Sequence, residues 1–117
     1  MRTAVFCFFV SVGLAVAGLL PLTTSELASP ETGRLINDMI DTLADSGGIG
    51  LAAPQVDESV RLAIIAIDGG PSRYGEIAPL PLTVFANPVI EVLDPKVAGY
   101  WEGCLSVPGL RGIVPRW

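Results

Sequence analysis

A single change of hydrophobic period divides the sequence and limits the folds open to it. Between residues 30 and 46, apolar side chains recur at spacings of three and four, which places them on one face of an α-helix. After residue 60 the apolar residues come in short runs separated by turn residues, as in β-strands. One helix followed by several short strands predicts an α+β fold class, with the strands mostly antiparallel.

The predicted helix has signals at both ends. Ser29 suits the N-cap, Pro30 the first helical position, and Glu31 the positive end of the helix dipole. Gly47 and Gly48 favour a stop after residue 46. The residues expected on the apolar face are Leu35, Ile36, Met39, Ile40, Leu43 and Ala44.

Short apolar runs after the helix are predicted to be strands. They cover residues 62–67, 82–86, 89–93 and 100–107. Residues 69–81 are rich in Gly and Pro and are predicted to form a loop, and Pro108–Gly109 is predicted to turn the chain.

Residues 4–20 form an uncharged apolar run ahead of this pattern. One arginine precedes the run and Ala15-Val16-Ala17 offers a small-residue cleavage site, so the segment resembles a secretory signal peptide. Its 17 residues also reach the lower limit for a membrane anchor, and an altered start of the reading frame is the remaining alternative. We expect a leader and linker over residues 1–29 and a folded domain over residues 30–117.

The chain contains no histidine, which excludes several kinds of active site for these residues. Among them are Ser-His-Asp and Cys-His nucleophile pairs and every histidine-containing zinc site. Two cysteines cannot form a four-cysteine metal site. Seven Lys and Arg against twelve Asp and Glu give a net charge of −5, so nothing in the charge balance favours nucleic acid or an anionic membrane surface.

Two short segments contain the residues that point to chemistry. The first is GIGLAAPQ at 48–55, where two glycines allow either the close approach of a ligand or simply a tight turn. The second is EGCLS at 102–106. Its cysteine, Cys104, suits a metal ligand, a nucleophile or a small buried apolar residue. Each segment taken alone leaves these alternatives open.

Taken together, in this order and at this separation, the two segments resemble the first two motifs of peptide deformylase. The similarity extends over residues 31–116 and includes the NPVI sequence at 87–90 and the VPR sequence at 114–116. The resemblance implies a peptide-deformylase-like α+β fold. It also implies an enzyme, a metal-dependent hydrolase that removes the formyl group from the N-terminal methionine of newly made proteins.

The resemblance assigns three residues to the reaction itself. Cys104 corresponds to the cysteine ligand of a divalent metal, which is Fe²⁺ first, with Zn²⁺ or Ni²⁺ as alternatives. Two histidines of a later HExxH helix complete the family's metal site. The side-chain amide of Gln55 and the backbone N–H of Leu105 correspond to the donors that stabilise the developing oxyanion.

Four further residues are expected around the substrate. By resemblance, Ile49 and Gly50 line the cleft and pair with the substrate backbone. Glu102 is expected to be a carboxylate close to the metal or substrate, and Arg111 an orienting charge. A surface carboxylate and a solvated arginine are the alternatives for these two.

The sequence departs from the family at its third motif. Because it has no histidine, it has no HExxH, so we expect a fold truncated before the metal-binding helix and a chain that is inactive alone. The alternatives are a non-catalytic module that binds formyl peptides, or a gene fragment with no function of its own.

The expected partners and location follow from the family. They are nascent formyl-methionine peptides in the cytoplasm, close to the ribosome, with no nucleic acid bound. A membrane or an exported location enters only if residues 4–20 act as an anchor or leader.

Overall fold

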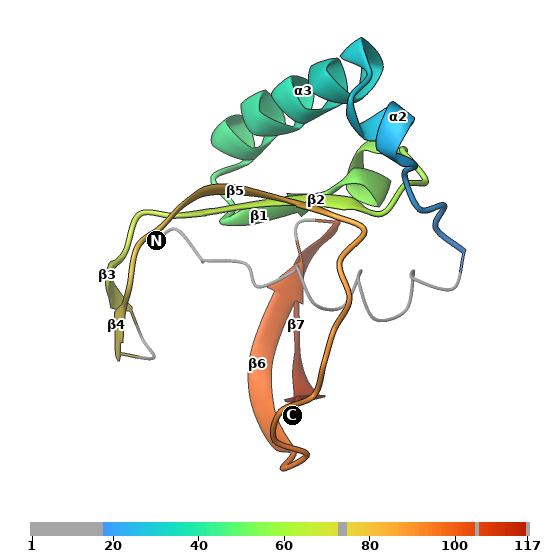
Figure 1. Ribbon diagram of the computed structural model, residues 1–117. Helices are drawn as coiled ribbons and strands as arrows, with labels where there is room; N and C mark the ends of the chain where they lie inside the picture. The colour runs from blue at the N-terminus through green and yellow to red at the C-terminus, as the bar shows by residue number, and fades with distance from the viewer. Residues whose placement is uncertain (1–17, 73–74, 105, 117) are drawn as a thin grey trace.

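The computed structural model describes residues 18–72, 75–104 and 106–116 of the chain. The described strands form three antiparallel sheets, ordered β1-β2-β5, β3-β4 and β6-β7. Helix α3 lies across one side of the sheet β1-β2-β5, and the β6-β7 hairpin extends from the other side (Figure 1). The elements are α2 (Thr24–Leu27), α3 (Pro30–Ser46), β1 (Gly50–Ala52), η1 (Ala53–Val56), β2 (Leu62–Ile67), β3 (Gly70–Ser72), β4 (Gly75–Ile77), β5 (Leu80–Ala86), β6 (Ala98–Cys104) and β7 (Val107–Arg116). The predicted α+β class is confirmed.

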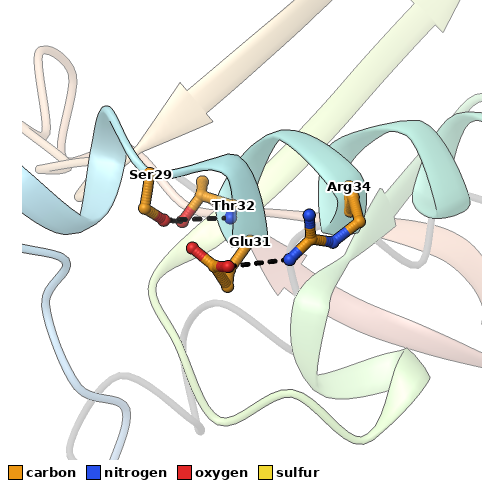
Figure 2. Close-up of polar contacts among 4 residues, drawn as sticks. All are labelled: Ser29, Glu31, Thr32 and Arg34. Atoms are coloured by element: carbon orange, nitrogen blue, oxygen red, sulfur yellow. Dashed lines mark hydrogen bonds and ion pairs between the residues drawn. The ribbon is translucent and has the colours of Figure 1, made fainter.

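Helix α3 begins and ends where the sequence predicts. The Ser29 hydroxyl accepts a hydrogen bond from the backbone N–H of Thr32 at 3.2 Å (Figure 2), as an N-cap residue should. Gly47 ends the helix in the left-handed conformation, with φ of 66°. The Arg34 Nη2 lies 2.7 Å from the Glu31 Oε1, and Figure 2 shows this ion pair on the first turns of the helix. Both of these side chains are largely exposed, so the pair contributes little to stability.

The core lies between α3 and the sheet. Met39 from α3 and Ile64 from β2 are fully buried, and each contributes about 1.5–3 kcal/mol of hydrophobic stabilisation relative to an exposed side chain. The other buried members of the cluster are Leu43, Leu51, Ala53 and Leu62. The predicted apolar face of the helix is confirmed except at Ala44, which is exposed. This packing fixes β1, the strand that carries the first motif.

Residues 20–22, where the predicted apolar run meets the predicted linker, are attached beside the ends of β2 and β5. Leu20 exchanges backbone hydrogen bonds with Ser59 and Arg61, both at 3.0 Å. The Asn87 side chain accepts from the Leu22 N–H at 2.8 Å and donates to the Leu22 carbonyl at 2.7 Å. Asn87 itself has a φ of 49°, a conformation that Asn adopts more readily than most residues. Residues 20–22 are therefore held beside β2 and β5 by specific hydrogen bonds.

Three local predictions are wrong. Residues 89–93 form no strand, because no described strand lies beside them and their side chains are exposed. Residues 69–81 contain β3, β4 and the start of β5, because the glycine-rich segment pairs with itself as a short hairpin. Pro108–Gly109 lies inside β7, where a register shift beside Cys104 and the positive φ of Gly109 accommodate it.

Most of the apolar run at residues 4–20 lies outside the described residues. Its interpretations as leader, anchor or altered start therefore stay predictions, as does the domain boundary at residue 29. Within the described ranges, no helix combines the length and the hydrophobicity needed to cross a membrane.

Candidate functional site

Residues 50–52 of the first motif form β1, one of the two edge strands of the three-stranded sheet. The Ile49 carbonyl accepts a hydrogen bond from the Ala66 N–H at 2.9 Å, and Gly50 lies opposite Ile65 in the register of β1 and β2. Because hydrogen-bonding direction alternates along an antiparallel strand, the backbone groups of Gly50 point away from β2. They face an edge of the sheet that no described strand occupies. An extended peptide can pair with β1 at this edge.

Gln55, in η1, connects this strand to the second motif. Its Oε1 accepts from the backbone N–H of Ala52 at 2.9 Å. Its Nε2 donates to the Ser106 hydroxyl at 3.2 Å, a contact between residues 51 positions apart. The two bonds fix the rotation of the amide, with its oxygen toward β1 and its nitrogen toward the β6-β7 hairpin. The structure thus brings GIGLAAPQ and EGCLS together.

The second motif lies at the end of the β6-β7 hairpin. Glu102, Cys104 and Arg111, all predicted site residues, line a hollow on this hairpin together with Val107 and Leu110. The predicted substrate-side and metal-side residues of the second motif therefore share one hollow. Leu105 lies outside the described residues, so its role as an oxyanion donor stays a prediction.

Cys104 is half-buried and disulfide-bonded in the structure. A cysteine binds metal as its thiolate, so this sulfur must be reduced before it can act as the predicted ligand. The predicted role of Cys104 as a metal ligand can therefore be tested only under reducing conditions.

Glu102 forms a close ion pair with Arg116. Its Oε1 accepts from the arginine Nε and its Oε2 from Nη2, both at 2.7 Å. Glu102 is only 8% exposed, and bidentate pairs of this kind are among the stronger charged hydrogen bonds. Hydrogen bonding to Glu102 raises the pKa of the Arg116 guanidinium. The carboxylate predicted to face substrate thus has both oxygens engaged by an arginine of the neighbouring strand.

The sequence analysis gave no role to two residues of the site, Ser106 and Arg116. Ser106 closes the EGCLS motif, and its contact with Gln55 depends on chain segments that only folding brings together. Arg116 ends the VPR sequence. The hairpin register sets Arg116 opposite Ala98 and Glu102 opposite Gly112, so the two residues share one face four positions apart, and the long arginine side chain spans the distance to the carboxylate. The motifs contained both residues, but neither spacing nor charge indicated their partners.

The described residues do not by themselves fit a catalytic metal. Among them, no three His, Cys, Asp or Glu side chains are grouped so that they could hold an ion. Catalytic metal centres generally take three protein ligands. Cys104 offers one donor, and the carboxylate of Glu102 is committed to Arg116.

Comparisons with known proteins agree on one family. The sequence profile described as polypeptide deformylase matches residues 21–117. The chain is 47% identical over 89 residues to peptide deformylase 1 of Bordetella pertussis, which covers 76% of this chain and 50% of that protein. It is 45% identical over 97 residues to peptide deformylase 2 of Pseudomonas putida, which covers 83% of this chain and 54% of that protein. The chain therefore spans about half the length of the curated relatives it matches.

Solved structures show the same similarity. The class I type b peptide deformylase from Acinetobacter baumannii, bound to Met-Ala-Ser, has a TM-score of 0.70 and 34% identity. The alignment covers 85% of this chain and 62% of that chain. A peptide deformylase from Synechococcus elongatus in complex with actinonin has a TM-score of 0.67 and 31% identity, covering 85% of this chain and 47% of that one.

The Glu102–Arg116 ion pair is expected to stabilise the β6-β7 hairpin. Removing one partner of a buried ion pair costs about 3–5 kcal/mol, and we expect Glu102→Gln to fall near the lower end, because Arg116 keeps 23% of its side chain exposed. Hydrogen–deuterium exchange should become faster in β6 and β7 and stay unchanged in β2. The matched control is Glu91→Gln at an exposed carboxylate. Equal exchange in the two variants would show that the pair does not stabilise the hairpin.

Proposed function

Because the chain belongs to the polypeptide deformylase family, we propose that its residues form the substrate-binding and oxyanion-stabilising part of a peptide deformylase site. The reaction is hydrolysis of the N-terminal formyl group of formyl-methionine peptides. The hydrogen bond between Gln55 and Ser106 carries this proposal, because it sets the first motif against the second. That hydrogen bond joins two motifs that lie far apart in the sequence.

The open edge of β1 binds the peptide backbone. Gly50 directs its backbone N–H and carbonyl to this edge, and Ile49 lies beside it at the entrance to the strand. A substrate that pairs here adds a strand to the sheet, so main-chain hydrogen bonds supply affinity with little dependence on sequence. This suits an enzyme whose substrates are the starts of many different proteins.

Gln55 and Leu105 stabilise the charge that develops on the formyl oxygen. The amide of Gln55 is held on one side by the Ala52 N–H and on the other by the Ser106 hydroxyl, so it needs little reorganisation during the reaction. One such donor contributes about 2.7–4 kcal/mol of transition-state stabilisation in other hydrolases. Arg111, on the same hollow as Cys104, orients the substrate by its charge.

A divalent metal, Fe²⁺ first and Zn²⁺ or Ni²⁺ as alternatives, supplies a hydroxide nucleophile near neutral pH when it is bound in a site of this kind. Cys104 is the one ligand that we assign among these residues. The described residues offer too few donors to hold a catalytic metal by themselves, and the 117 residues contain no histidine. We therefore propose that the chain by itself is inactive.

The proposed place of action is the cytoplasm, close to the ribosome. Formyl-methionine occurs there at the start of nascent chains, and the net charge of −5 offers no attraction to nucleic acid. Export or membrane attachment through residues 4–20 remains the alternative, and cell fractionation distinguishes the two locations.

The reduced 117-residue chain should release no formate from a formyl-Met peptide, because a single protein ligand does not hold a catalytic metal. The measurement compares the chain with Cys104→Ala after addition of Fe²⁺, Ni²⁺ or Co²⁺ under reducing, oxygen-free conditions. Formate release above the Cys104→Ala level would contradict the proposed inactivity. Binding of the peptide without turnover would instead favour the non-catalytic module.

The assigned residues should function when the rest of the fold is present. A chimera that carries this chain's matched residues in place of the corresponding 89 residues of the Bordetella pertussis protein should hydrolyse formyl-Met peptides. In the chimera, Gln55→Ala should lower kcat by about 10²–10³ through loss of one oxyanion donor.

The control for this chimera is Asn37→Ala, which removes a side-chain amide from the solvent-exposed face of α3 and should leave kcat unchanged. A folded chimera with no activity would contradict the proposed function. Equal kcat for Gln55→Ala and Asn37→Ala would show that Gln55 does not stabilise the oxyanion.

A further inference from the structure

Ser106 is the residue through which the second motif contacts Gln55. Its side chain is exposed, and it lies just before β7, on the hairpin that also carries Cys104. A serine in a turn often bonds to the backbone of its own segment. Here the hydroxyl contacts a side-chain amide 51 positions away, at 3.2 Å. The contact therefore joins a turn residue to a residue with a proposed part in the reaction.

The direction of each hydrogen bond at Gln55 follows from its partners. A backbone N–H can only donate, so the amide atom that faces the Ala52 N–H must be the oxygen. The amide nitrogen then faces Ser106, and because this nitrogen can only donate, the serine hydroxyl must accept. Ser106 thus supplies an acceptor to Gln55 that alanine lacks.

The two contacts constrain different parts of the amide. The Ala52 bond spans three positions within the first motif and fixes the amide oxygen. One bond at the oxygen does not define the plane of the amide, and a glutamine side chain loses much rotamer freedom when it is ordered. The Ser106 bond fixes the nitrogen as well. Because both N–H groups lie in the amide plane, their directions are then set.

We propose that Ser106 is a positioning residue for the oxyanion donor of the deformylase reaction. By accepting one N–H, its hydroxyl holds the Gln55 amide in the orientation that it uses toward the formyl oxygen. A donor that is oriented in advance needs no reorganisation when charge develops on the substrate. The role of Gln55 in this proposal rests on the proposed function, whereas the action of Ser106 on Gln55 rests on the hydrogen bonds alone.

A contact that only joined the two motifs would have other consequences. Ser106 is exposed and Gln55 is half-buried, so water can replace the lost partner and the fold loses little stability. We therefore expect Ser106→Ala to leave the Tm of the chain nearly unchanged. Its effect should instead fall on the order of the Gln55 amide and on kcat.

The first measurement uses the isotope-labelled 117-residue chain. Relaxation of the side-chain amide nitrogen gives the order parameter of the Gln55 Nε2 group. We expect an ordered amide in the unsubstituted chain, a clear fall of the order parameter in Ser106→Ala, and recovery in Ser106→Thr, which keeps the hydroxyl. The matched control is Ser59→Ala, because the Ser59 side chain is exposed and lies outside the site. This control should leave the Gln55 amide ordered.

The second measurement uses the chimera with the Bordetella pertussis protein. Ser106→Ala should lower kcat by about tenfold with little change in KM, because the lost contact serves the transition state. Ser106→Thr should keep most of kcat, and Ser59→Ala should keep all of it. Gln55→Ala combined with Ser106→Ala should lower kcat no further than Gln55→Ala alone, since Ser106 acts through Gln55.

Three results would overturn the positioning role. They are a Gln55 amide that is mobile in the unsubstituted chain or equally ordered in Ser106→Ala, an active chimera in which Ser106→Ala and Ser59→Ala have the same kcat, and a double variant whose losses simply add. An inactive folded chimera in which Ser106→Ala still mobilises the amide would leave the positioning role intact and count against the proposed function. An active chimera in which Ser106→Ala leaves the amide ordered would do the reverse.

Discussion

The burial of one face of α3 against β1 and β2 is the constraint on which the rest of the structure depends. Met39 and Ile64 lose all contact with water in this interface, and Leu51 of β1 is buried beside them. The strand that carries the first motif is therefore fixed by the core rather than by a loop. A rigid support of this kind allows a backbone edge and a neighbouring amide to hold one geometry.

Two polar contacts hold residues in place outside the hydrophobic core. Gln55 joins η1 to the second motif through Ser106, and Glu102 joins β6 to β7 through Arg116. The first sets the relation between the motifs, and the second stabilises the hairpin on which Cys104 lies. The proposed chemistry depends on both, since an oxyanion donor and a metal ligand act together only at a fixed separation.

The sequence predicted the parts of the fold that rest on local signals. Helix α3 and strand β2 were predictable because Ser29, Gly47 and the apolar spacing are read within a few residues. Residues 89–93 were not, because an apolar run becomes a strand only beside a partner strand. In the site, the motifs identified Gln55 and Cys104, whereas the contacts of Gln55 and Glu102 arise from pairing across the fold.

The central claim is that the two motifs meet through Gln55 and Ser106. The most direct measurement is the nuclear Overhauser effect between the side-chain amide protons of Gln55 and the β-protons of Ser106, in the isotope-labelled chain. We expect a cross-peak, because the Gln55 Nε2 and the Ser106 hydroxyl oxygen lie 3.2 Å apart. A Gln55 amide whose cross-peaks come only from residues of its own segment would contradict the claim.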